Sequence, residues 1–212
     1  GKNTIERSIE QLSNYGINNI LITLGYQSEN FIKFFNQIRA KYKIDIDVFV
    51  EEKPLGECGA IWNFKNKLAD DFIFINGDII YSIDFDKLIY FHKRCKSLLT
   101  LVTHLSDHPE DSDLVSSPDG ALISEIFYKN EISKSKQKAY LGNAGIFVIR
   151  NEVLNLFKEP IKKESRTVFN FLVKNLFNMK KNIYSYNTTE YIKDMGTPKR
   201  LKKIEKDLKD NN

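Results

Sequence analysis

Apolar residues recur along the chain with two different spacings, and these separate helices from strands. Apolar positions three and four residues apart predict helices over 3–15, 28–42, about 60–68, 84–96, 151–157, 167–178 and from 198 onward. Short apolar or alternating runs predict strands over 17–24, 44–50, 72–75, 97–104, 146–149, 183–186 and 191–192, and a strand pair within 114–127.

The order of these elements predicts an α/β fold. Helix and strand alternate through the first half of the chain, which indicates a parallel sheet covered by helices on both faces. Around the turn sequence Ser117-Pro118-Asp119-Gly120, strand pairs replace this alternation and add antiparallel strands. We therefore expect a Rossmann-like, mostly parallel mixed sheet flanked by helices, in a single domain over residues 1–212.

The first and last helices carry recognisable end signals. Asn3 and Glu6 have the spacing of a capping box, and Gly16 is the expected stop of the first helix. Thr197 as the cap and Pro198 as the first helical residue predict where the last helix begins.

Charge and composition exclude several classes of protein. The formal charge of +4 comes from 32 basic and 28 acidic residues that are interspersed except at a lysine-rich C-terminal end. This distribution indicates a solvated surface and no nucleic-acid partner, although it suits an acidic, phosphorylated substrate. Cys58 and Cys95 form no metal-binding spacing and no disulfide framework, and no apolar run reaches about 20 residues. We expect a cytoplasmic protein without membrane attachment.

Two aspartates stand where a sheet collects its ligands. The apolar run 72–75 ends in Asn76-Gly77-Asp78, and Asp194 likewise follows a short strand and precedes a turn glycine. Because ligands gather at the carboxyl ends of strands, the two carboxylates are expected to meet at one edge of the sheet. One or two carboxylates together with substrate phosphates are enough to hold Mg²⁺. The alternative is that Asp78 and Asp194 are turn residues only.

Other candidate motifs are weaker. The stretch from Leu55 to Ala60 is a glycine-containing loop that ends at a helix start, where backbone N–H groups can meet a phosphate or a base edge. It lacks the spacing of a dinucleotide fingerprint and the lysine of a phosphate loop. His92, His104 and His108 have no serine or cysteine motif nearby, so covalent nucleophilic catalysis is not expected.

Taken together, these segments resemble the sugar-1-phosphate nucleotidyltransferases, over almost the whole chain. The similar blocks are Glu51 to Ala60, Asn76-Gly77-Asp78, the region of Lys129, Asn143-Ala144-Gly145, and Asp194 to Pro198. Within that family, the stretches 108–115 and 190–198 look most like guanylyltransferases acting on D-glycero-D-manno-heptose 1-phosphate. Mannose-1-phosphate guanylyltransferases are the nearest alternative.

The resemblance implies a GT-A-like nucleotide-diphospho-sugar transferase fold and a reaction. A sugar 1-phosphate attacks the α-phosphorus of a nucleoside triphosphate, GTP in this subfamily, and pyrophosphate leaves. Asp78 and Asp194 are implied as the catalytic residues that bind Mg²⁺. The implied nucleotide-binding residues are Leu55, Gly56, Gly59, Asn76 and Gly77, and the implied sugar-binding residues are Asn143, Lys129 and Gly142.

Three departures from the family pattern qualify this expectation. Glu57-Cys58 stands where the family has small or hydroxyl residues, which is expected to narrow the base pocket, and Lys129 lacks its usual glutamate and proline neighbours. The sequence begins at Gly1-Lys2-Asn3, past the family's first strand and glycine-rich triphosphate loop. We therefore expect an N-terminally incomplete transferase, with neighbouring strands left unpaired and with little activity alone.

Two further alternatives follow from the same resemblance. A chain without the triphosphate loop is also compatible with a catalytically inactive regulatory module that binds a nucleotide sugar. Some heptose enzymes resemble this chain followed by a phosphatase domain, so the lysine-rich end is where a fused or associated phosphatase is expected.

Overall fold

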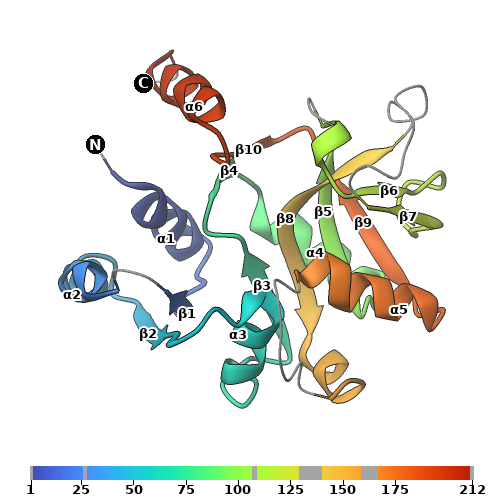
Figure 1. Ribbon diagram of the computed structural model, residues 1–212, viewed down its shortest axis with the longest axis horizontal. Coiled ribbons are helices and arrows are strands. Elements are labelled where there is room, and N and C mark those ends of the chain that lie inside the picture. Colours follow the sequence, from blue (N-terminus) through green and yellow to red (C-terminus); the bar gives the residue numbers. More distant parts are fainter. Residues whose placement is uncertain (1, 26–27, 107–108, 129–139, 159–166, 211–212) are drawn as a thin grey trace.

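Helices surround three sheets in the computed structural model, which describes residues 2–25, 28–106, 109–128, 140–158 and 167–210 (Figure 1). The α-helices are α1 (Thr4–Asn14), α2 (Glu29–Tyr42), α3 (Gly56–Phe64), α4 (Phe85–Arg94), α5 (Lys174–Asn178) and α6 (Pro198–Asp210). The strands are β1 (Asn19–Leu24), β2 (Asp45–Val50), β3 (Asp71–Ile75), β4 (Ile79–Ser82), β5 (Leu99–His104), β6 (Leu114–Ser116), β7 (Glu125–Phe127), β8 (Leu141–Arg150), β9 (Ile183–Asn187) and β10 (Tyr191–Asp194). Shorter helical turns are η1 (Pro109–Asp111), η3 (Asn151–Asn155) and the π-helical η4 (Phe169–Val173), which continues into α5.

The α/β class with a mixed sheet is confirmed, but the expectation of a mostly parallel sheet is met only in part. Parallel pairs are β1 with β2 and β5 with β9. Strand β8 runs antiparallel to β3, β5 and β6, and β4 runs antiparallel to β10. The alternation of helix and strand does not reveal this, because β8 comes from the second half of the chain and inserts between β3 and β5.

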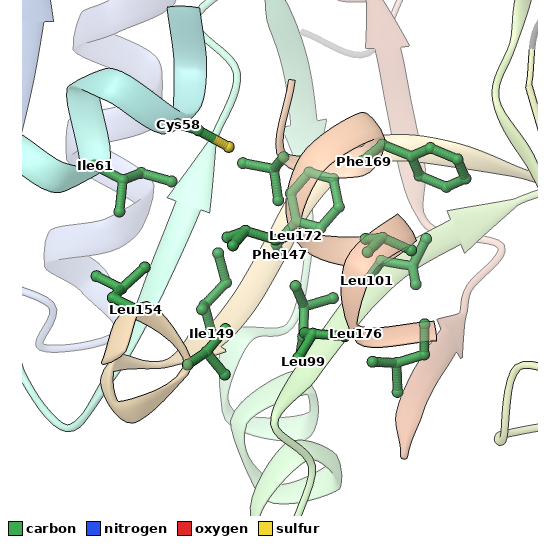
Figure 2. Close-up of a cluster of buried hydrophobic side chains, with 14 of the residues drawn as sticks. Cys58, Ile61, Leu99, Leu101, Phe147, Ile149, Leu154, Phe169, Leu172 and Leu176 are labelled. Carbon is green, nitrogen blue, oxygen red and sulfur yellow. The ribbon is translucent and has the colours of Figure 1, made fainter. Parts of the chain in front are cut away.

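The main core lies on one face of the large sheet. Figure 2 shows side chains of β5 and β8 packed against α3 and the helical segment η4–α5. Leu99 and Leu101 from β5, together with Phe147 and Ile149 from β8, are almost completely buried there. The apolar stripe expected on the helix at 167–178 supplies the opposite wall through residues such as Leu172. This packing fixes α3 relative to the sheet ends that carry the candidate site.

Strands β1 and β3 are less well covered. All five residues of β3 are only half-buried, although four of them are apolar, whereas five of the six β5 residues are fully buried. In the described part of the chain, β3 forms a ladder only with β8, and β1 only with β2. An open depression of about 420 Å³ lies against β1 and β2. Among the described residues, each of these two strands therefore has one edge without a ladder partner.

Several element boundaries differ from the sequence-based expectation. Helix α3 begins at Gly56, so Gly59 lies inside the helix and not in a loop. Strand β8 begins at Leu141, and Asn143 therefore belongs to a strand. Strand β4 was not expected, because it is short and its partner β10 lies more than 100 residues later. The segment after β8 forms only η3 and not a helix to residue 157.

Only half of the expected capping box forms at α1. The Asn3 side chain accepts a hydrogen bond from the Glu6 backbone N–H at 2.8 Å, as expected for a cap. The Glu6 carboxylate accepts hydrogen bonds from Lys41 and Tyr42 of α2 instead. These bonds lower the pKa of Glu6, with the Lys41 contact as the main cause. A tertiary contact has thus replaced the local one.

Candidate active site

The two aspartates singled out in the sequence lie on neighbouring backbone segments. Asp194, the last residue of β10, is opposite Ile79 of β4, and Asp78 directly precedes Ile79. The Met195 N–H donates a 2.8 Å hydrogen bond to the Asp78 carbonyl. Figure 1 shows β4 and β10 side by side, and their antiparallel register brings the backbones of Asp78 and Asp194 to the same edge.

Asp194 is held by groups from α6 and its preceding turn. Its Oδ1 accepts hydrogen bonds from the Gly196 N–H at 3.0 Å and from Arg200 Nη1 at 2.7 Å. A Cβ at Gly196 would approach the same oxygen to 3.0 Å, so glycine keeps this turn uncrowded. Burial lowers the pKa of Arg200, but its hydrogen bonds to Asp194 and Asp111 outweigh burial and raise the pKa overall.

The Asn76-Gly77-Asp78 turn is fastened to β8. The Asn76 N–H donates to the Gly145 carbonyl at 3.0 Å, and the Gly145 N–H donates to Asn143 Oδ1 at 3.1 Å. Gly145 has φ +73°, and a Cβ there would lie 3.0 Å from Asn76 Nδ2. A residue other than glycine would thus strain the backbone and push against Asn76. This contact places the expected sugar-binding Asn143 next to the aspartate turn.

The start of α3 lies near the same turn, because Glu57 of its first turn interacts with Asn76 and Asp78. Leu55 precedes the helix and packs against Gly59, where a Cβ would clash with the Leu55 Cβ at 2.7 Å. Gly56 has φ +71°, which glycine tolerates. The expected nucleotide-binding residues Leu55, Gly56 and Gly59 therefore lie at one helix N-terminus, where the N–H groups of the first turn have no acceptor within the helix.

The structure explains Glu57-Cys58, the first departure from the family pattern. The Glu57 carboxylate accepts a 2.7 Å hydrogen bond from the Val168 N–H, and the Cys58 thiol points to the Thr167 carbonyl at 3.5 Å. Burial raises the pKa of Glu57, and the negative charge of Asp78 adds to this. Glu57 is thus engaged with the segment before η4, which gives a structural reason for its presence.

A small cavity of about 40 Å³ lies between Asn143 and Asp194. It is lined by Ile79, His104, Ser112, Asn143, Ala144, Ile192, Lys193 and Asp194. The sequence-based reasoning missed His104, Ser112 and Lys193 as candidates. The position of Lys193 beside Asp194 was an available signal, whereas His104 and Ser112 join the site only through the pairing of β5, β6 and β8.

The two remaining residues predicted to contact the sugar are Gly142 and Lys129. Gly142 lies in β8 beside Asn143, and a Cβ there would approach the Ser106 Cβ to 2.9 Å. Lys129 lies outside the residues that the structure describes.

The donor groups at this edge fit Mg²⁺. Asp78 and Asp194 offer carboxylate oxygens, and the buried Asn76 Oδ1 has no protein hydrogen-bond partner. In the described part of the chain, no group of three or more His, Cys, Asp or Glu side chains forms a complete metal site. A cation here would therefore need substrate oxygens to complete its shell, which is how Mg²⁺ is usually bound in phosphate-transfer sites.

Comparisons with known proteins agree with this architecture. The family model described as Nucleotidyl transferase matches residues 1–211. Mannose-1-phosphate guanyltransferase of Saccharomyces cerevisiae is 28% identical over 203 residues, covering 92% of this chain and 53% of that protein. The chain spans about half the length of the first curated relatives it matches.

Solved structures establish the fold. HddC from Yersinia pseudotuberculosis superposes with a TM-score of 0.77 at 24% identity, covering 98% of this chain and 86% of that one. UDP-glucose pyrophosphorylase complexed with UDP-glucose superposes with a TM-score of 0.80 at 13% identity, covering 100% and 88%. The expected GT-A-like fold is thereby confirmed. With its family model matched over nearly the full length, the chain belongs to the nucleotidyl transferase family.

Proposed function

We propose that this protein, in its full natural chain, transfers a nucleotidyl group from a nucleoside triphosphate to a sugar 1-phosphate and releases pyrophosphate. The observation that carries the proposal is the β4–β10 pairing, which brings Asp78 and Asp194 to one edge next to Asn143. Family membership and the sugar-1-phosphate guanyltransferases among its relatives support the same reaction.

The residues at this edge suit an in-line nucleotidyl transfer. The attacking oxygen belongs to the sugar 1-phosphate, so the protein has to position two substrates and stabilise charge, without a nucleophile of its own. Asp78 and Asp194 would hold Mg²⁺, which supplies charge neutralisation at the phosphates. Asn143 would hydrogen-bond sugar hydroxyls, while Leu55, Gly56 and Gly59 at the start of α3, with Asn76 and Gly77, would position the nucleotide.

We propose guanine as the base and D-glycero-D-manno-heptose 1-phosphate as the first candidate sugar, with mannose 1-phosphate as the alternative. The base is supported by the guanyltransferases among the relatives and by an HddC structure complexed with GMP-PN. The relatives named for mannose 1-phosphate favour the alternative sugar, whereas the heptose rests on the stretches 108–115 and 190–198.

We also propose that one further strand completes this domain between β1 and β3. Each of these strands lacks a ladder partner on its other edge among the described residues, and Ile20 of β1 and Ile73 of β3 border the same core cluster. A strand there would cover both edges. Its absence in a shorter chain would favour the alternative of a binding module without turnover.

We propose that the protein acts in the cytoplasm, with a fused or associated partner domain. A nucleoside triphosphate substrate fits the cytoplasm, as do cysteines that have neither a metal-binding spacing nor a disulfide framework, and the described residues contain no helix that could cross a membrane. Curated relatives about twice as long leave room for a fused or associated domain, for which a phosphatase is the candidate.

Pyrophosphate release by the full natural chain tests the function. GTP should support release with heptose 1-phosphate or mannose 1-phosphate, whereas ATP, UTP and dTTP should support much less. In parallel, calorimetric titration of the 212-residue chain with GDP-mannose, GDP-heptose and GTP tests the product site. Binding of a GDP-sugar without turnover in the full chain would favour the regulatory module. The absence of both binding and turnover would refute the transferase and the regulatory module alike.

A further inference from the structure

The first turn of α6 carries an arginine that the helix itself does not favour. Arg200 is the third residue of α6, and the positive end of the helix dipole repels a cation at this position. The helix start is already capped, because the Arg200 backbone N–H donates to Thr197 Oγ1 at 3.2 Å. The guanidinium is therefore not needed to form the helix.

The charge of Arg200 is balanced by two carboxylates from different parts of the chain. Nη1 donates to Asp194 Oδ1 at 2.7 Å, and Nη2 donates to Asp111 Oδ2 at 3.1 Å. The side chains of Arg200 and Asp194 are 25% and 27% exposed, whereas that of Asp111 is 58% exposed. Exposed ion pairs are weak, so Asp194 is the stronger of the two partners and Asp111 is easily released.

Asp194 cannot bind the Arg200 guanidinium and a divalent cation equally strongly at the same time. A magnesium ion bound at Asp194 would stand within a few ångströms of Arg200, and the two positive charges would repel each other. A guanidinium forms bidentate hydrogen bonds with phosphate oxygens as readily as with carboxylate oxygens. If Asp194 bound the metal instead, a phosphate of the substrate could replace it as the hydrogen-bond acceptor for Arg200.

We propose that Arg200 binds a phosphate group of the substrate, and that Asp194 and Asp111 hold its side chain ready before substrate and Mg²⁺ enter. The inference rests on the proposed function, because it takes Asp194 as a magnesium ligand. The sugar 1-phosphate is the better placed of the two substrates. Asp111 directly precedes Ser112, which lines the cavity shared by Asn143 and Asp194.

The test uses the full natural chain with Arg200→Ala and Arg200→Lys, and with Lys202→Ala as the matched control. Lys202 carries the same charge on an exposed position of α6. Without substrates, Mn²⁺ binding measured by electron paramagnetic resonance should tighten at least about threefold in Arg200→Ala, because a competing cation is gone. Arg200→Lys keeps the charge and should bind Mn²⁺ as the wild type does.

Steady-state kinetics supply the second readout. The KM for the substrate whose phosphate Arg200 binds should rise about tenfold in Arg200→Ala, and also in Arg200→Lys, because a lysine lacks the planar fork. A rise for the sugar 1-phosphate alone places the contact there, and a rise for GTP alone places it on the triphosphate. Lys202→Ala should change neither the Mn²⁺ affinity nor either KM.

Two results overturn the inference in distinguishable ways. Unchanged or weaker Mn²⁺ binding in Arg200→Ala, or unchanged KM values for both substrates while the wild type turns over, removes the role of Arg200 alone. Absence of pyrophosphate release by the wild type with any sugar 1-phosphate refutes the proposed function and this inference together. Arg200→Lys keeps the test valid if Arg200→Ala fails to fold.

Discussion

The backbone N–H of Val168 donates a 2.7 Å hydrogen bond to the carboxylate of Glu57, which lies 111 residues earlier in the chain. This bond joins the start of α3, where the nucleotide is expected, to the segment that leads into η4. Cys58 makes a second contact to the same segment through the Thr167 carbonyl. The two residues that depart from the family pattern are thus explained by two contacts to one segment.

Removal of this acceptor should destabilise the protein. Glu57→Ala leaves the buried Val168 N–H without a partner and should lower the free energy of unfolding by about 1 to 3 kcal/mol. Glu57→Gln retains an acceptor oxygen and should lose less. Urea unfolding measures both variants, with the exposed Glu52→Ala as the control. Equal losses for Glu57→Ala and Glu57→Gln would show that the hydrogen bond is not the relevant interaction.

The raised pKa of Glu57 gives this residue a signature in the pH dependence of stability. Its ordinary value is 4.5, and burial raises it in the folded protein. The folded state therefore binds a proton that the unfolded chain has lost, so this contribution to stability falls as pH rises from 4.5 through the raised pKa. Glu57→Gln removes the slope, and unfolding at a series of pH values measures it. Parallel curves for the two proteins would contradict the assignment.

A buried histidine should act in the opposite direction. His92 is completely buried, its Nδ1 lies 2.8 Å from Thr100 Oγ1, and burial lowers its pKa below 6.5. The nearby Asp71 raises the pKa but does not outweigh burial. The unfolded chain thus takes up a proton first, so stability is present above pH 6.5 and is lost as pH falls through the lowered pKa. His92→Gln should remove this acid-side loss in urea unfolding, and a loss that persists in the variant would place its origin elsewhere.

Gly145 should be among the least replaceable residues near the site. Gly145→Ala combines a left-handed backbone conformation with a contact to Asn76 Nδ2 at 3.0 Å. Gly120→Ala is the matched control, because Gly120 has φ +82° but no heavy atom within 4 Å of the added Cβ. In the control, backbone strain alone should lower the free energy of unfolding by about 1 to 2 kcal/mol. Gly145→Ala should lose more and also bind the nucleotide sugar more weakly, as thermal unfolding and calorimetry would show. Equal effects in the two variants would mean that Asn76 adjusts freely.

Asp78 should matter for turnover far more than for folding. In the full natural chain, Asp78→Ala removes one of the two carboxylates expected to hold Mg²⁺ and should cost about 3 kcal/mol of transition-state stabilisation, or about a hundredfold in rate. Asp119→Ala is the control, since Asp119 is an exposed aspartate that, like Asp78, stands next to a turn glycine. Pyrophosphate release measures both variants. Unchanged turnover in Asp78→Ala would show that Asp78 is only a turn residue.

Local sequence patterns predicted most of the helices and several of the strands correctly. Periodicity predicted α1, α2, α4 and the helical segment 167–178, because each buries one apolar stripe against the sheet. The motif Asn76-Gly77-Asp78 and the turn around Asp194 were recognisable because, in each, an aspartate and a glycine lie within two residues of each other shortly after a strand-like run. The expectation that the two aspartates meet at one edge was also correct.

What the sequence alone determined is therefore most of the helices and strands, though not β4, and the candidate chemistry, since each depends on residues close together in the chain. Only the tertiary structure decided that β8 inserts antiparallel beside β3 and that His104 and Ser112 join the cavity. It also decided the partners of two charged side chains. Glu57 accepts from Val168, 111 residues later, and Arg200 pairs with Asp194, 6 residues earlier, and with Asp111, 89 residues earlier. Strand pairing and long-range ion pairs depend on which surfaces meet after the chain collapses, and no local pattern encodes that choice.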